Sequence, residues 1–337
     1  MKIHLAEKKA ILILNLVIAG SILGGCGKSL KQDTDATMKQ VATEEELTQA
    51  ASEDTTTEGA VTFTDALGRE VTVKHPQKVA AVMGSFANVW LLAGGNLTAV
   101  TNDFYEESNT EVNNDIVNLG EMKSPDMEQL LAANVDFVIL SSKIDEHVAL
   151  QNTLEKAGIA CAYFEVETVD DYLAMLKTCT DITGDTKSYQ KNGEAVKEQI
   201  ESIIASVPKG EQPKVLFLRA FSTGVKAKGS DNMTGAMLKD LGCINIADGE
   251  DSLLEDLSIE KIIEEDPDYI FVVTMGSSEE DALAVVQETL IDNPVWGELT
   301  AVKENHYVVL PKDLFHLKPN NRWGESYQML ADILYGE

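Results

Sequence analysis

The sequence contains an internal repeat. Residues 126–140, which read DMEQLLAANVDFVIL, are matched by residues 258–272, which read SIEKIIEEDPDYIFV, at a constant offset of 132 positions. Each copy predicts a short helix with a polar N-cap, a turn that contains an aspartate, and a buried strand. A second similarity pairs 79–102 with 215–248, and both segments predict a strand, a loop, a helix that ends in glycine and a strand. The simplest fold for such a chain is two α/β halves of similar topology.

Short apolar runs alternate with amphipathic stretches in both halves. The first half predicts strands at 79–83, 97–101, 137–140 and 159–164, and helices at 88–93, 127–133, 147–157 and 169–182. This alternation predicts parallel sheets that are covered by helices on both faces. Residues 61–73 have alternating apolar positions around Gly68, which predict a β-hairpin before the first half.

A long helix is predicted between the halves. Residues 187–207 carry apolar side chains at helical spacing, and Gly184 and Pro208 are stop signals on either side. At ~1.5 Å per residue this helix is roughly 30 Å long, enough to cross a domain. The predicted fold class is therefore α/β, with two Rossmann-like lobes of mainly parallel sheets joined by a long rigid α-helix. We expect the N-terminal lobe at 61–184, the connecting helix at 185–208 and the C-terminal lobe at 209–337.

The first residues are typical of a lipoprotein signal peptide. Three lysines precede an apolar run at 10–23, which is too short for a comfortable transmembrane helix. Leu-Gly-Gly-Cys at 23–26 is similar to a bacterial lipobox, whose cysteine is acylated and becomes the new N-terminus. We expect a signal peptide at 1–25, lipidation at Cys26 and a flexible acidic linker at 26–60.

Charge and cysteine content exclude several classes of protein. The chain has 27 basic and 56 acidic residues and a formal net charge of −29, which argues against binding of nucleic acid. Its 4 cysteines are too few for a disulfide scaffold, and Cys161, Cys179 and Cys243 are expected to be buried thiols in apolar elements. No histidine pair has a short ligand spacing, so we expect no directly bound metal ion and no cofactor.

Several motifs occur in the order that one family has them. They are Phe-Thr-Asp-Ala-Leu-Gly-Arg at 63–69, the repeated helix–Asp–strand units, Asn-Pro-Val-Trp at 293–296 and Val-Val-Leu-Pro at 308–311. With the lipobox and the connecting helix, they resemble the class III solute-binding lipoproteins of ABC importers, the iron–siderophore, heme and cobalamin group. The resemblance covers about residues 61–335. It implies two lobes on a helical backbone, a ligand in the cleft between them, and delivery to a membrane permease and its ATPase.

The candidate ligand contacts lie in the loops that follow the strands, because ligands bind beyond the carboxyl ends of strands in open α/β sheets. Arg219 is the sharpest candidate, since it follows a buried strand and its donor fork suits the oxygens of an anionic chelate. The alternative is an interlobe ion pair with Glu165 or Asp103. The whole set of candidates is Met83, Ser85, Asn102, Phe104, Tyr105, Ser142, Arg219, Phe221, Lys226, Thr274, Met275, His316, Arg322 and Trp323.

Other candidates have alternative interpretations too. Met83 and His316 could be a heme axial pair, or a core gap-filler and a supporting residue of the C-terminal segment. The alternative for the aromatic candidates is packing in the core. Arg322, which precedes a predicted helix, alternatively caps it or forms an ion pair, and Lys226 alternatively lies in a solvated loop.

Glu128 and Glu260 hold equivalent positions in the repeat. The resemblance implies that one acidic residue in each lobe docks into a basic pocket of the permease, and these two residues match best. Acidic residues at a helix start also stabilise the helix electrostatically, and the two roles are compatible.

The function expected from these features is reversible binding without catalysis. We expect a lipid-anchored monomer on the extracytoplasmic face of the cell membrane, which captures a ferric siderophore-like chelate and delivers it to the permease. Heme or a corrinoid is the alternative ligand. A metal-cluster enzyme on the same fold would need clustered cysteines or a nucleophile–base set, and the sequence offers neither. An adhesion lipoprotein would have a cleft without converging polar groups.

Overall fold

The computed structural model describes residues 59–107, 115–210, 212–276 and 278–336. The predicted signal peptide, Cys26 and the predicted linker up to residue 58 lie outside these residues. No helix within the described ranges combines the length and the apolar character that a membrane span requires.

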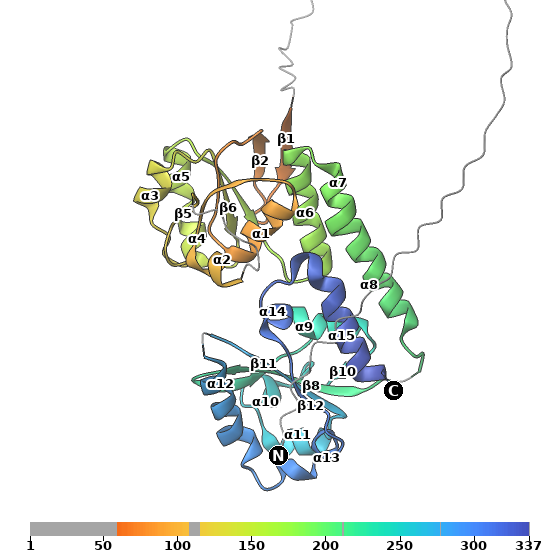
Figure 1. Cartoon of the computed structure of the whole chain (residues 1–337). Helices are drawn as coiled ribbons and strands as arrows, with labels where there is room; N and C mark the ends of the chain where they lie inside the picture. The colour runs from red at the N-terminus through yellow and green to blue at the C-terminus, as the bar shows by residue number, and fades with distance from the viewer. Residues whose placement is uncertain (1–58, 108–114, 211, 277, 337) are drawn as a thin grey trace, which may run out of the picture. The chain divides into compact units, whose positions relative to one another are not determined.

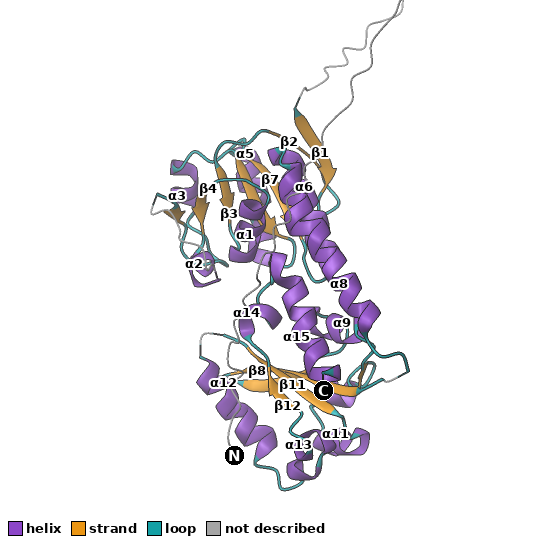
Figure 2. Cartoon of the chain, turned by 45° about the vertical axis from the view of Figure 1, so that its right-hand side comes forward, coloured by secondary structure: helices purple, strands orange, loops and turns teal. Residues whose placement is uncertain are grey.

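The N-terminal lobe is built on a sheet of parallel strands in the order β5-β4-β3-β6-β7. Figure 1 labels β5 and β6 of this sheet, and Figure 2 labels β3, β4 and β7. The strands are β3 (Val79–Ala81), β4 (Leu97–Val100), β5 (Val117–Asn118), β6 (Phe137–Ser141) and β7 (Ala160–Phe164). The helices are α1 (Gly84–Leu92), α2 (Asn102–Glu107), α3 (Met127–Ala132), α4 (Asp145–Ala149), α5 (Gln151–Lys156) and α6 (Val169–Thr183). Every residue of β6 is buried, as expected for a central strand with helices on both faces.

The predicted hairpin is confirmed. Its strands are β1 (Ala60–Thr64) and β2 (Glu70–Lys74), which pair antiparallel. In the turn, the Arg69 guanidinium lies 2.7 Å from the Asp65 carboxylate and donates to the backbone carbonyl of Cys161 in β7 at 3.0 Å. This arginine therefore attaches the hairpin to the sheet of the N-terminal lobe.

The C-terminal lobe repeats the parallel arrangement in the order β10-β8-β11-β12, and β9 pairs antiparallel with β8. The strands are β8 (Lys214–Phe221), β9 (Gly224–Ala227), β10 (Ile244–Asn245), β11 (Tyr269–Thr274) and β12 (Tyr307–Val309). The helices are α9 (Met233–Asp240), α10 (Asp251–Leu254), α11 (Ile259–Glu265), α12 (Glu279–Val286), α13 (Thr300–Lys303), α14 (Lys312–Phe315) and α15 (Trp323–Tyr335). Shorter helical turns are η2 (Gln287–Ile291), η3 (Trp296–Glu298) and η4 (Asn320–Arg322).

The repeat in the sequence is also a repeat in space. The Asp136 carboxylate accepts a hydrogen bond from the backbone N–H of Lys78 at 3.0 Å, and the Asp268 carboxylate accepts one from Lys214 at 2.7 Å. Lys78 directly precedes β3, and Lys214 is the first residue of β8. Each aspartate thus fixes the start of its own strand to the start of the neighbouring strand.

The connecting helix differs in detail from the uniform helix predicted at 187–207. It consists of α7 (Thr186–Tyr189), the π-helical turn η1 (Gln190–Glu194) and α8 (Ala195–Ser206). The side-chain amide of Asn192 donates to the backbone carbonyl of Leu92 at 2.8 Å. The backbone carbonyl of Asn192 accepts a hydrogen bond from the Tyr172 hydroxyl at 2.7 Å. Apolar periodicity cannot predict this local widening, because tertiary hydrogen bonds to α1 and α6 stabilise it. Both views show α6 beside this helix (Figures 1 and 2).

One apolar cluster extends through both lobes. In β8, Leu216 and Leu218 face a cluster of the C-terminal lobe, whereas Val215 and Phe217 face a cluster that also contains Phe137 of the N-terminal lobe. The shared cluster includes buried side chains of α8 and α15, and the described residues of both lobes belong to a single compact unit. The lobes are therefore held by packing as well as by the covalent connection, which restricts how far they can move apart.

Candidate functional site

Arg219 lies near the end of β8, opposite Lys226 in the neighbouring strand β9. Its guanidinium forms no ion pair with another described residue, and its Nε atom is buried without a hydrogen-bond partner. Burial lowers the pKa of this guanidinium, while the charges of Glu167 and Asp231 act in the opposite direction. An unpaired, partly buried guanidinium is costly unless an anion completes its hydrogen bonding. Arg219 is therefore a candidate anion-binding group.

Arg219 and two lysines act together on His316. Burial lowers the pKa of His316 to about 4, and the positive charges of Lys312, Arg219 and Lys318 lower it as well. His316 follows α14 directly, and Lys312 is the first residue of that helix. In both views α14 lies between the N-terminal lobe and the sheet of the C-terminal lobe (Figures 1 and 2). Three cations thus act on His316 in a chain that is strongly acidic overall, while Glu167 and Asp231 act on Arg219.

A hollow of about 420 Å³ opens beside these cations. It is lined by residues of α2, α12 and α14, together with their flanking loops: Glu106, Glu107, Glu279, Pro311, Lys312, Asp313 and Leu317. Burial, together with the charges of Asp103 and Glu106, raises the pKa of Glu107 to about 7, although Lys312 and Lys318 lower it. The hollow is thus lined by carboxylates from both lobes and by one cation, Lys312.

Two polar contacts near this hollow join the two lobes. The Lys318 ammonium lies 3.1 Å from the Glu167 carboxylate, and the Asn320 side chain donates to the backbone carbonyl of Ser85 at 2.9 Å. Glu167 precedes α6 in the N-terminal lobe, whereas Lys318 and Asn320 belong to the segment between α14 and α15. The side chain of Lys318 is only 14% exposed, so water screens this ion pair less than a surface pair.

The alternative partners predicted for Arg219 are engaged elsewhere. Glu165 pairs with Lys143 at 2.8 Å, and the Asp103 carboxylate accepts the backbone N–H of Gly84 at 2.6 Å. Arg322 forms ion pairs, which was the alternative to ligand binding. Its guanidinium lies 2.8 Å from the carboxylates of both Asp313 and Glu325. These two ion pairs raise the pKa of Arg322 and occupy its donors.

The other ligand candidates differ in how far they are buried. Phe104, Trp323, Ser85 and Thr274 are buried, with exposed fractions of 2% or less. Tyr105 is 39% exposed, and the side chain of Asn102 donates to Glu121 at 3.0 Å. Met83, Ser142, Phe221, Met275 and His316 are partly buried, and Lys226 is exposed. The buried aromatic rings follow their alternative interpretation as core residues.

Sequence reasoning missed four charged residues of this region: Glu107, Glu167, Lys312 and Lys318. A usable signal was present, because Lys312 and Lys318 bracket His316 in a short segment that follows a strand. The two glutamates carry no comparable signal, since their proximity to the lysines depends on how the lobes pack.

Glu128 and Glu260 lie on the surface, each at the second residue of its helix, α3 or α11. The Asp126 carboxylate caps α3 by accepting the backbone N–H groups of Glu128 and Gln129, and the Ser258 hydroxyl caps α11. Equivalent helices therefore present the two glutamates in the same local frame.

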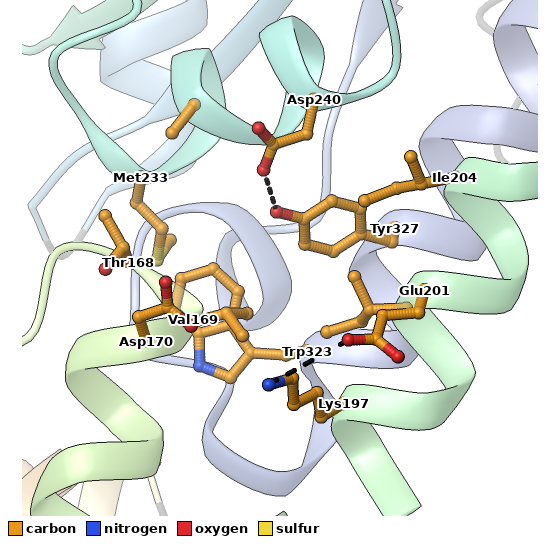
Figure 3. A pocket seen from close by; sticks show the side chains of 12 residues that line it. Thr168, Val169, Asp170, Lys197, Glu201, Ile204, Met233, Asp240, Trp323 and Tyr327 are labelled. Carbon is orange, nitrogen blue, oxygen red and sulfur yellow. Dashed lines mark hydrogen bonds and ion pairs between the residues drawn. The ribbon is translucent and has the colours of Figure 1, made fainter.

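A second hollow, of about 320 Å³, lies between α6, α8, α9 and α15 (Figure 3). Trp323, Tyr327 and Met233 contribute apolar surface, and the Tyr327 hydroxyl donates to Asp240 at 2.6 Å. The lining comes from both lobes and the connecting helix. Its shape is thus sensitive to any change in the angle between the lobes.

Within the described ranges, no group of three or more His, Cys, Asp and Glu side chains is arranged to hold a metal ion. Cys161, Cys179 and Cys243 are buried free thiols. Burial raises the pKa of Cys179 and of Cys243 to about 12. These thiols are therefore protonated and unreactive at neutral pH.

The sequence model of the periplasmic binding protein family matches residues 79–314. The chain belongs to this family, and the predicted resemblance is confirmed. The fold and the family together define a substrate-binding protein of an ABC importer, not an enzyme.

Relatives and solved structures agree with this class. YhfQ of Bacillus subtilis (strain 168), provisionally named an ABC transporter substrate-binding lipoprotein, is 21% identical over 282 residues, which cover 77% of this chain and 84% of YhfQ. The structure of the siderophore-binding protein BauB with two molecules of acinetobactin and ferric iron has a TM-score of 0.67 at 17% identity, covering 82% of this chain and 99% of BauB. The structure of Staphylococcus aureus IsdE with heme has a TM-score of 0.62 at 17% identity, covering 77% of this chain and 98% of IsdE. At these identities the structures establish the fold, which confirms the predicted pair of lobes on a connecting helix.

Proposed function

We propose that this protein binds an anionic iron chelate of the ferric siderophore type between its lobes and delivers it to an ABC permease. The supporting observation is Arg219, whose Nε atom is buried without a hydrogen-bond partner. The oxygens of a carboxylate, catecholate or hydroxamate chelate would complete its hydrogen bonding. Lys312 and Lys318 would then supply further attraction for the charge of the complex.

Heme is the second candidate, and His316 supports it. Its low pKa keeps the imidazole neutral at physiological pH, which is the form that coordinates iron. Met83, which directly precedes α1, would be the second axial ligand in that case. A corrinoid is a further alternative of the same importer class. Arg219 and the lysines would then bind the propionates of heme or the phosphate of a corrinoid.

Tryptophan fluorescence separates these ligands. The chain has 3 tryptophans, and Trp323 lies among side chains of both lobes. We expect saturable quenching by ferric catecholate, hydroxamate or carboxylate siderophores, with weaker responses to the iron-free chelators, hemin and cobalamin. Tight binding of hemin without a response to any ferric chelate would contradict the first choice and favour heme.

The proposal includes attachment to the membrane and docking. Acylation of Cys26 would hold the protein at the extracytoplasmic face of the cell membrane, and residues 26–60 would connect the anchor to the lobes. Glu128 and Glu260 would dock into cationic pockets of the permease. The domain boundaries at 61–184, 185–208 and 209–337 and the monomeric state are also part of this proposal.

Radiolabelled palmitate tests the anchor. The label should enter the wild-type chain and not a Cys26→Ser variant. Incorporation into both proteins would contradict acylation at this residue.

A further inference from the structure

Two exposed apolar side chains recur at the same position of the repeat. Leu131 in α3 is 43% exposed and Ile263 in α11 is 37% exposed, and 132 positions separate them, as in the rest of the repeat. In each helix the preceding residue, Leu130 or Ile262, is fully buried. One exposed leucine on a protein surface is ordinary. Its recurrence at the equivalent site of the second lobe indicates a shared role.

Each of these side chains lies next to one of the proposed docking glutamates. Leu131 follows Glu128 by three residues, and Ile263 follows Glu260 by three, so each pair shares one face of its helix. Neither glutamate forms an ion pair with a lysine, arginine or histidine among the described residues. Each lobe thus presents an exposed carboxylate and an exposed apolar side chain together. The Glu260 carboxylate accepts a hydrogen bond from the Ser258 hydroxyl at 3.2 Å, which leaves its charge uncompensated.

The ends of α3 and α11 also have matching backbone conformations and side-chain caps. Asn134 after α3 and Asp266 after α11 both adopt the left-handed backbone conformation, with φ of 53° and 41°. Asp126 and Ser258 cap the opposite ends. The carboxylate and its apolar neighbour therefore have a common geometry in both lobes, which fits a partner that offers the same acceptor twice.

We propose that Leu131 and Ile263 are apolar anchors that pack against the permease beside the docking carboxylates. This inference rests on the proposed docking of Glu128 and Glu260. An apolar side chain that is buried next to an interfacial ion pair excludes water and strengthens the electrostatic attraction. The acceptor in the permease is accordingly a cationic side chain next to an apolar depression, present once for each lobe.

The test uses the full chain and its importer, reconstituted with the ATPase in proteoliposomes. A Leu131→Ser, Ile263→Ser double variant should require a roughly tenfold or higher concentration for half-maximal stimulation of ATP hydrolysis. A Leu67→Ser, Val295→Ser variant is the matched control, because these side chains are 36% and 39% exposed but lie outside the two helices. The control should behave as wild type, and both variants should keep wild-type ferric-chelate quenching and thermal unfolding.

The salt dependence of docking distinguishes the role of the apolar anchors from that of the two glutamates. Added salt should weaken docking of the serine variant as it weakens the wild type, because both glutamates remain. A Glu128→Ala, Glu260→Ala variant should lose most of that dependence. If the alanine variant fails to dock and the serine variant docks as wild type, Leu131 and Ile263 are not anchors, while the proposed function stands. If neither variant is impaired, docking through these helices is wrong altogether.

Discussion

The Lys318 ammonium and the Glu167 carboxylate, 151 residues apart in the sequence, lie 3.1 Å from each other and join the two lobes. Glu167 is also the first of the negative charges that act on Arg219. An anionic ligand at the proposed site would interact with the same two cations as this carboxylate. We interpret Glu167 as an internal counter-ion that an anionic chelate displaces.

Replacement of this counter-ion should tighten ligand binding. A Glu167→Gln variant removes the competing charge and keeps the size of the side chain, so affinity for a ferric siderophore should rise about twofold to fivefold. Fluorescence titration measures this change. Glu165→Gln is the matched control, because Glu165 pairs with Lys143 instead. Weaker binding by the Glu167 variant would mean that this carboxylate contacts the ligand favourably.

Removal of the unpaired guanidinium should have the opposite effect. Arg219→Ala should weaken chelate binding roughly tenfold to a hundredfold, the range expected when hydrogen bonds to a charged group are lost. Arg322→Ala should have a smaller effect on affinity, since Asp313 and Glu325 already occupy that guanidinium. Equal affinities of the wild type and the Arg219 variant would remove Arg219 from the site, provided that thermal unfolding is unchanged.

The pKa of His316 makes stability depend on pH. Its value of about 4 lies below the ordinary 6.5, so between these values the folded protein binds fewer protons than the unfolded chain. The contribution of this histidine to the free energy of unfolding is complete above pH 6.5 and is lost as the pH falls towards 4. Urea unfolding at a series of pH values should give a shallower dependence for His316→Asn than for the wild type. An unchanged dependence would show that His316 is not held neutral.

The two strand-fixing aspartates should matter for folding and not for ligand binding. Asp268→Ala leaves the backbone N–H of Lys214 without its acceptor and should lower the free energy of unfolding by about 1–2 kcal/mol. Asp268→Asn keeps an oxygen acceptor and should lower it less. Urea unfolding measures both values. Equal stability of the alanine variant and the wild type would contradict this structural role.

Local patterns predicted much of the fold because burial on both faces of a parallel sheet leaves a direct trace in the sequence. Residues 137–140 and 215–218 are continuous apolar runs, and both are buried strands. The same periodicity did not predict the π turn at Gln190–Glu194, which depends on bonds to Leu92 and Tyr172. It also did not separate core aromatic residues such as Trp323 from residues that face the cleft.

For the candidate site, position after an apolar run singled out Arg219 as a candidate, although the residue lies within β8 and not in a loop after it. Such a position does not reveal which charges meet there. Glu107 and Glu167 precede Arg219 by many residues, whereas Lys312 and Lys318 follow it by many. Only the packing of the lobes brings them together.

The sequence by itself determined the doubled α/β architecture, the connecting helix and the family, because apolar periodicity and a repeated motif are local properties of the chain. Tertiary structure alone decided that Arg219 is left without a partner, that Lys318 pairs with Glu167, and that Leu131 and Ile263 remain exposed. Charge pairing and exposure depend on distances between segments that are far apart in sequence, and those distances are set only when the two lobes pack around their common core.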